Sequence, residues 1–217
     1  NHDDAIQPLL NQKVILCSME ELVVADLNHD QMQNDSFHKL RIMRVRRCEK
    51  LMNIVSSDQI KLFQNLEELE VWNCGTLEAV FDFKGLKVNQ EHEEAVLGQL
   101  RSLDLKHLPK LKHVWRMVPK GIHGLQNLRS LVVEGCDSLR SLLSPSTAKL
   151  LVKLQELKVK KCEMMEEVIE TEVIETAKEM ILFPELESLS LEALPKLESF
   201  YSSKWPSLKT FKCVGLS

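Results

Sequence analysis

The sequence predicts an α/β solenoid in which short parallel strands form one curved sheet and the chain returns along the outer side. Two observations lead to this fold class. One phrase of nine residues, Leu-x-x-Leu-x-Val/Leu-x-x-Cys/Leu, recurs along the chain. Its fourth and sixth residues are apolar and alternate with polar residues, as in a strand with one buried face. So short a unit buries its apolar face only against neighbouring copies, which indicates a stack of repeats.

The eight copies of this phrase divide the chain into units. Weaker copies begin at Met19, Leu40 and Leu208. Close copies begin at Leu66, Leu100, Leu128, Leu154 and Leu186. We therefore expect a partial repeat at 1–18, followed by a leucine-rich repeat array of about eight units at 19–217. The expected shape is a horseshoe with the parallel sheet on its concave face and an irregular or short-helical convex side.

Both ends of the chain suggest a piece of a longer protein. Asn1 is not an initiator methionine, and Ser217 follows a repeat directly, without the polar capping unit that a solenoid needs. No apolar run approaches the length of a membrane helix, so we expect no membrane span.

The cysteines predict structural thiols. None of the six forms a C-x-x-C pair, and Cys48, Cys74, Cys136 and Cys162 share the ninth position of the phrase. A small side chain that is easily buried suits this position, where the chain turns after the strand. Free thiols favour a reducing, cytoplasmic setting.

Composition and motifs argue against catalysis. The 28 basic and 32 acidic residues give a net charge of −4, which favours neither a nucleic-acid nor a membrane partner. The sequence contains no phosphate-binding loop, zinc-ligand spacing or hydrolase motif. We expect no enzyme activity, cofactor or metal in this chain.

The candidate site is the concave face, onto which the third, fifth and seventh residues of each phrase point. The candidate residues are Ile42, Arg44, Arg46, Glu68, Glu70, Trp72, Asp104, Lys106, Glu134, Lys158 and Lys160.

Two interpretations of these residues stay open. They form a cross-strand charge ladder, with Arg44 and Arg46 opposite Glu68 and Glu70, and with Glu134 flanked by Lys106 and Lys160. Alternatively they form a protein-binding strip, anchored by Trp72, Ile42 and the arginines, because tryptophan and arginine dominate interface energetics. In the first interpretation Trp72 only covers the stems of Arg44 and Arg46.

Two acidic inserts lengthen the spacing between copies. They occupy 88–94 and 163–179, and we expect both to form exposed loops. Val168, Ile169, Val173 and Ile174 are apolar enough for a short helix or strand within the second insert.

The phrases also resemble a known family. The stretches 66–81, 154–169 and 183–197, together with the Leu-Pro-Lys-Leu phrases that begin at Leu108 and Leu194, resemble the leucine-rich repeats of plant disease-resistance proteins. More narrowly, they resemble the coiled-coil, nucleotide-binding, leucine-rich repeat immune receptors. The resemblance implies a receptor that binds ADP or ATP in a domain absent from this chain.

The resemblance further implies a role in recognition and autoinhibition. The expected partners are a pathogen effector or guarded host protein and, within the receptor, the nucleotide-binding domain. The alternatives are a substrate-recognition arm of a ubiquitin-ligase adaptor or a general scaffold. An enzyme or a nucleic-acid binder would instead show activity in the isolated chain or salt-sensitive binding to nucleic acid.

Overall fold

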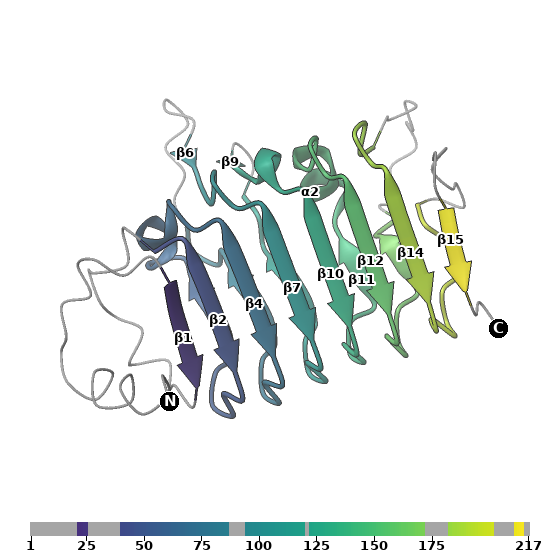
Figure 1. The fold of residues 1–217 in the computed structure, drawn as a ribbon, viewed down its shortest axis with the longest axis horizontal. Helices are drawn as coiled ribbons and strands as arrows, with labels where there is room; N and C mark the ends of the chain where they lie inside the picture. Colours follow the sequence, from purple (N-terminus) through teal and green to yellow (C-terminus); the bar gives the residue numbers. More distant parts are fainter. Residues whose placement is uncertain are drawn as a thin grey trace.

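A computed structural model describes residues 21–25, 40–86, 94–119, 122–171, 182–201 and 211–214 of the 217-residue chain. An eight-stranded parallel sheet runs the length of the molecule, with its strands side by side in chain order (Figure 1). The strands are β1 (Glu21–Ala25), β2 (Ile42–Arg46), β4 (Glu68–Trp72), β7 (Ser102–Lys106), β10 (Ser130–Glu134), β12 (Glu156–Lys160), β14 (Ser188–Glu192) and β15 (Phe211–Val214). The predicted solenoid with a parallel sheet is confirmed.

Register places equivalent positions of successive repeats beside one another. Leu69 of β4 pairs with Met43 of β2 and Leu103 of β7, and all three side chains are fully buried. The residues between them are only partly buried, because successive side chains of a strand point to opposite faces. β2, β4, β7, β10 and β12 therefore each give one face to the core and the other to the concave surface, whereas in β14 Ser190 is buried as well.

A left-handed residue ends most of these strands. Asn73 has a φ of 56° and His107 a φ of 55°. The Asn73 amide donates a hydrogen bond to the Lys106 carbonyl oxygen of the next repeat at 3.0 Å, so the ladder continues as the chain turns out of the sheet. The next residue, Cys74 or Leu108, then enters the core.

The ninth position forms a column of buried thiols. Cys48, Cys74, Cys136 and Cys162 are buried and free, so the prediction of structural thiols is confirmed for these four. The Cys162 thiol donates to the Lys160 carbonyl oxygen at 3.3 Å. Hydrogen bonding with Cys48, together with burial, raises the pKa of Cys74. Cys17 and the side chain of Cys213 lie outside the described residues.

Short parallel strands also build the convex side, where the sequence predicted irregular or short-helical structure and offered a short strand only as an alternative around Val168 and Ile169. β3 (Asn53–Ser56), β5 (Ala79–Asp82) and β8 (His113–Arg116) form one sheet, and β11 (Ser141–Leu143) and β13 (Glu167–Ile169) form another. Each strand contributes two consecutive buried apolar residues. These pairs are Ile54 and Val55, Val80 and Phe81, Val114 and Trp115, Leu142 and Leu143, and Val168 and Ile169.

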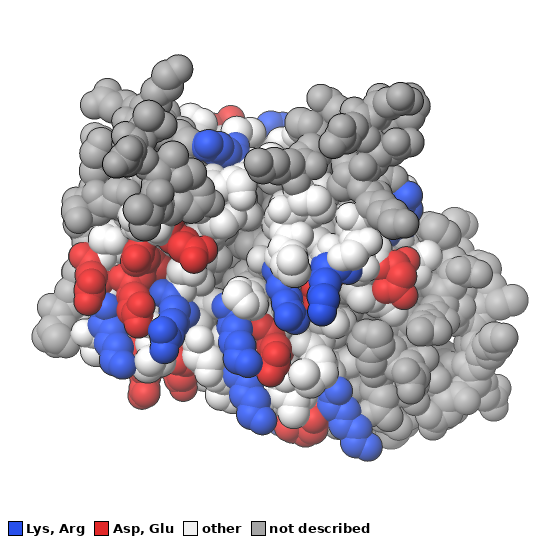
Figure 2. All heavy atoms as spheres, turned by 180° about the vertical axis from the view of Figure 1, so that it is seen from behind, with Lys and Arg blue, Asp and Glu red and all other residues white. Residues whose placement is uncertain are grey.

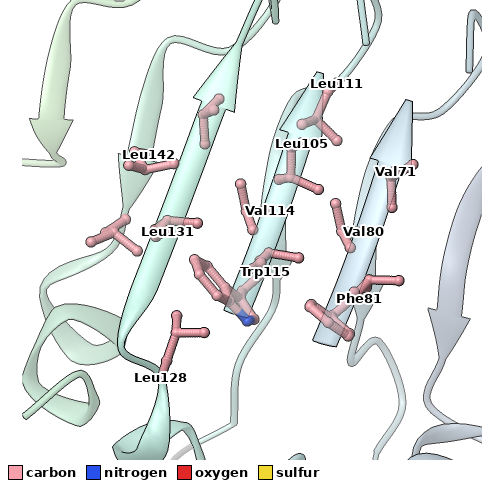
Figure 3. Packing of buried hydrophobic residues seen from close by; sticks show 14 of the residues in the cluster. Val71, Val80, Phe81, Leu105, Leu111, Val114, Trp115, Leu128, Leu131 and Leu142 are labelled. Atoms are coloured by element: carbon pink, nitrogen blue, oxygen red, sulfur yellow. The ribbon is translucent and has the colours of Figure 1, made fainter. Parts of the chain in front are cut away.

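The core lies between the concave sheet and this second layer. Figure 3 shows Leu105 and Leu131 of the concave sheet facing Val114 and Leu142 of the convex layer. The rings of Phe81 and Trp115 stack with centroids 6.3 Å apart and planes inclined by 15°. Each repeat therefore packs mainly on its neighbours, and this makes stability depend on the interfaces between repeats.

Short helical segments and a small pair of strands lead into the concave strands. They are η3 (Ile60–Phe63), η4 (Leu125–Asn127), α2 (Pro145–Leu150), β6 (Glu94–Ala95) and β9 (Ile122–His123). Gly124 has a φ of 148°, and a Cβ atom there would overlap the backbone of Val96. Within the described part of the chain, none of the helices has the length and apolar character needed to cross a membrane.

The second acidic insert is shorter than predicted. Residues 163–171 belong to the ordered repeat, where Met165, Val168 and Ile169 are fully buried. The expectation of an exposed loop from Glu163 was wrong, because the glutamates here alternate with core residues. The remaining residues 172–179, the first insert at 88–93 and the partial repeat at 1–18 lie outside the described residues.

Candidate functional site: the concave strip

The seventh position of the phrase forms one continuous row across the concave sheet. On six successive strands the row reads Arg46, Trp72, Lys106, Glu134, Lys160 and Glu192, each in register with the next. Adjacent strands lie about 4.8 Å apart, which brings neighbouring side chains of the row within reach of one another. We call the whole concave face of the sheet, to which this row belongs, the strip.

Trp72 lies between two cations in this row. The Arg46 guanidinium carbon is 4.4 Å from the centroid of the Trp72 ring, and the Lys106 ammonium nitrogen is 5.2 Å from it. Both distances are within the range of a cation–π interaction. Trp72 is thus held rigidly and is only partly buried. Its ring meets the charged group of Arg46, whereas the sequence suggested that it covers the stems of Arg44 and Arg46.

Glu70 is the carboxylate beside the two arginines. Arg44 Nε donates to Glu70 at 3.1 Å, and Arg46 Nη2 lies 3.9 Å from the same carboxylate oxygen. The register places Ile42 opposite Glu68. The predicted ladder therefore forms through Glu70, and the prediction that Glu68 stands opposite an arginine was wrong.

Ion pairs continue along the second half of the strip, with partners that differ from those predicted. Glu134 lies in register between Lys106 and Lys160, as predicted, but its carboxylate accepts a hydrogen bond from Lys161 at 2.9 Å. The lysines of the two flanking strands form other ion pairs: Lys106 with Asp104 at 2.6 Å, Lys158 with Glu156 at 2.6 Å, and Lys160 with Glu192 of β14 at 3.2 Å. The sequence did not single out Glu156, Glu192 or Lys161 as site residues.

Two of these carboxylates are held in the charged form. The hydrogen bond from Lys161 lowers the pKa of Glu134, and the hydrogen bond from Lys158 lowers the pKa of Glu156. Both carboxylates therefore stay ionised at neutral pH, and the alternation of charge along the strip is fixed.

Six predicted residues come together in one compact area, which we call the Trp72 patch. It consists of Arg44, Arg46, Glu70, Trp72, Asp104 and Lys106 on β2, β4 and β7. Three of its polar atoms, Arg46 Nε, Trp72 Nε1 and Asp104 Oδ1, are buried without a hydrogen-bond partner among the described residues. Lys158 and Lys160 lie apart from the patch, on β12.

A shallow hollow follows the turns beyond the carboxyl ends of the strands. Its volume is about 470 Å³, and the two glycines Gly75 and Gly135 contribute to its lining. Lys161, the partner of Glu134, also lines it, so the hollow adjoins the strip. We call this hollow the turn groove. Its other lining residues are Glu49, Asn73, His107, Pro109, Asp137 and Glu163.

The opposite face of the molecule also carries both signs of charge. Lys112 pairs with Glu78 at 3.1 Å and Arg116 pairs with Asp82 at 3.5 Å, both across the convex strands. Figure 2, which shows the molecule from behind, has blue and red side chains interleaved. Charge alone therefore does not distinguish the two faces. The concave face differs in carrying Trp72, whose ring lies between Arg46 and Lys106. Among the described residues, no group of three or more His, Cys, Asp or Glu side chains is placed to hold a metal ion.

Three comparisons with known proteins agree with this geometry. A family model described as plant disease resistance protein RPS2-like, leucine-rich repeats, matches residues 11–163 and 150–214. The probable disease resistance protein At4g27220 of Arabidopsis thaliana is 35% identical over 108 residues, which are 48% of this chain and 11% of that protein. The chain thus matches only a small part of that relative's length.

A solved structure establishes the fold independently. The leucine-rich repeat domain of the type III effector XCV3220 (XopL) superimposes with a TM-score of 0.55 at 18% identity, covering 97% of this chain and 81% of that domain. At this identity the likeness concerns the fold alone. Because the family model matches most of the chain, the chain belongs to the leucine-rich repeats of RPS2-like plant disease resistance proteins.

Proposed function

We propose that this chain is the protein-recognition and autoinhibitory module of an intracellular plant immune receptor, which senses a pathogen effector or a guarded host protein. The observation that carries the proposal is the Trp72 patch. Tryptophan and arginine are the residues that most often dominate protein interfaces, and here a rigid sheet presents them together.

The patch is suited to a protein partner because its geometry is already formed. The Trp72 ring is fixed between Arg46 and Lys106, so a partner does not have to order it on binding. The charged groups around it carry both signs, which favours a polar partner surface with complementary charges. Such an arrangement gives specificity as well as affinity.

The strip is too small for a tight interface by itself. Eight strands at about 4.8 Å and five residues at about 3.3 Å give roughly 570 Å². A stable interface covers about 800 Å² on each partner. A strong partner would therefore extend over an edge, and the turn groove beside Glu134 and Lys161 is one surface that it would reach.

Autoinhibition follows if two partners compete for the strip. In the resting receptor the nucleotide-binding domain occupies it, and the effector or guarded protein displaces that domain. The equilibrium between the resting and active states then shifts by the difference in affinity of the incoming protein for the two states. ADP or ATP would bind in the nucleotide-binding domain, outside this chain. The four free buried thiols support an intracellular setting.

Charge reversal in the full-length receptor tests the proposal. The test variant is Arg44→Glu with Arg46→Glu, and the matched control is Lys112→Glu with Arg116→Glu. The control also reverses two cations that are paired across strands, but on the convex side. The readout is cell death in leaf tissue, with and without the pathogen that the receptor recognises, at equal protein levels.

We expect the concave variant to lose the response or to respond without the pathogen, and the control to behave as wild type. Equal behaviour of the two variants would remove the concave strip from the recognition mechanism.

A further inference from the structure

A row of basic residues from three successive repeats lies where the concave strands begin, away from the strip. It consists of Arg101, Arg129 and Lys153, which precede β7, β10 and β12, and all three side chains are exposed. We call this row of three residues the basic edge. These three side chains belong neither to the strip nor to the core.

The backbone places the two arginines directly beside one another. The Arg129 amide donates to the Arg101 carbonyl oxygen at 2.8 Å, and the Arg101 amide donates to the Glu67 carbonyl oxygen at 2.7 Å. We call the equivalent positions of successive repeats the rungs of this ladder. Arg101 and Arg129 therefore lie on adjacent rungs, about 4.8 Å apart. Two like charges in this arrangement repel each other and destabilise the sheet.

Glu67 is the only carboxylate among the described residues that lies in register beside Arg101, and it relieves this repulsion only in part, through its charge. Glu67 lies on the rung before Arg101, but both of its oxygens are taken by Arg41, at 2.9 and 3.0 Å. On the other side, the rung after Arg129 carries the neutral Gln155, whose amide donates to the Arg129 carbonyl oxygen at 2.8 Å. Among the described residues, no ion pair of Arg101 or Arg129 closer than 4.0 Å is found.

A third cation is held on the same edge by a polar bridge. Lys153 Nζ donates to Asn127 Oδ1 at 2.9 Å, and Asn127 Nδ2 in turn donates to the Gly98 carbonyl oxygen at 2.6 Å. Lys153 is thereby directed toward the rung of Arg129. A neutral amide, rather than a carboxylate, positions this ammonium group, so its charge is left uncompensated.

We propose that the basic edge is a docking site for a carboxylate-rich segment of a separate partner protein. Two guanidinium groups on adjacent rungs suit a single carboxylate that accepts hydrogen bonds from both, and Lys153 suits a second carboxylate beside it. A carboxylate of the partner placed between Arg101 and Arg129 then reduces the repulsion that remains between them, which favours binding.

A nucleic acid fits this edge less well than an acidic protein. The three cations span three rungs, about 10 Å. Beyond them the edge turns acidic, with Glu67 on one side and Glu185 and Glu187 on the other. A nucleic-acid backbone needs a continuous basic track and aromatic platforms for its bases, and this short segment supplies neither.

Binding of a short poly-glutamate peptide to the whole chain, followed by fluorescence polarisation, tests the proposal. The test variant is Arg101→Gln with Arg129→Gln. The matched control is Lys112→Gln with Arg116→Gln, which removes the same charge from the convex side. We expect the test variant to bind at least about tenfold more weakly and the control to change by less than about twofold.

Thermal unfolding separates a binding role from a structural one. We expect the midpoint of the test variant to stay close to that of the wild type, because both side chains are exposed and the substitution removes the attraction to Glu67 as well as the repulsion between the arginines. A lower midpoint, or an equal loss of peptide binding in both variants, would overturn the proposal. Tighter binding of a single-stranded oligonucleotide through the same arginines would also overturn it. A gain in peptide affinity when Glu91, Glu93 and Glu94 are replaced by glutamine would also overturn it. Such a gain would mean that carboxylates of this chain, and not those of a separate partner, compete for the basic edge.

Discussion

The guanidinium carbon of Arg46 lies 4.4 Å from the centre of the Trp72 ring, and the two residues are register partners on β2 and β4. The same ring has Lys106 on its other side. Three successive repeats are thus joined on the concave face by a cation, an aromatic ring and a second cation. The contact stabilises the interfaces between these repeats.

A double-mutant cycle measures this contact. For Arg46→Ala and Trp72→Ala, we expect a coupling free energy of about 0.5–1 kcal/mol, because the pair is a partly exposed cation–π interaction. Urea denaturation of the wild type, both single variants and the double variant gives the value. The pair Trp72 and Lys158, which lie three strands apart, is the control and should be additive within about 0.5 kcal/mol. Additivity of Arg46 and Trp72 would contradict the contact.

The sequence predicted the concave sheet and the placement of the candidate residues on its strands, because both depend on local alternation. The third, fifth and seventh residues of each phrase lie where a strand with one buried face must place them, as Arg44, Arg46 and Trp72 show. The convex strands were missed except at Val168 and Ile169, where a short strand was one alternative, although paired apolar residues such as Val80 and Phe81 also recur in each repeat. Two consecutive apolar residues do not show the alternation that marks a strand with one buried face. The pattern of a single repeat therefore cannot identify a convex strand.

Hydrogen-bond partners could not be predicted from register alone. Long side chains reach beyond the residue directly opposite, so Glu134 bonds Lys161 instead of Lys106 or Lys160. The choice depends on rotamers and on the turn after β12, where Lys161 adopts a φ of 51°. A lysine with a positive φ leaves no signal in a single sequence.

The convex layer should contribute strongly to stability. Trp115→Ala removes a ring that is 8% exposed and stacked on Phe81, so we expect a loss of about 3–5 kcal/mol in the free energy of unfolding. Met117→Ala, at a side chain that is 64% exposed, should change it by less than about 0.5 kcal/mol. Urea denaturation checks both. A loss below about 1 kcal/mol for Trp115→Ala would show that the convex layer is not a cooperative part of the core.

The buried thiol column should resist alkylation in the native protein. The thiolate is the reactive form, and hydrogen bonding between neighbouring thiols together with burial raises the pKa of Cys74 and of Cys136. The hydrogen bond with Cys136 instead lowers the pKa of Cys162, so its protection depends on its complete burial. We expect iodoacetamide at pH 8 to leave Cys48, Cys74, Cys136 and Cys162 unmodified, as read by peptide mass spectrometry. The same reagent in urea should label all four. Native labelling at the unfolded rate would mean that the repeats open readily.

The ion pair of Glu67 should give a measurable pH dependence. The hydrogen bond from Arg41 lowers the pKa of Glu67 from its ordinary value of 4.5. Since the folded-state pKa is depressed, the stabilisation is present above about pH 4.5 and is lost as the pH falls through the lowered value. We expect the wild type to be more stable than Glu67→Gln by less than about 1 kcal/mol at pH 7, and the difference to shrink at pH 3. A constant difference would exclude the ion pair as its cause.

Hydroxyl-radical footprinting of the full-length receptor tests the central claim that the concave strip is the recognition surface. The reagent oxidises exposed tryptophan and methionine side chains, and the chain offers Trp72 on the concave face with Met52 and Met117 exposed at the ends of the convex strands. In the resting receptor, compared with this chain alone, we expect slower oxidation of Trp72 and unchanged oxidation of Met52 and Met117. Protection of the two methionines with Trp72 unchanged would contradict the account and move the recognition surface to the convex side.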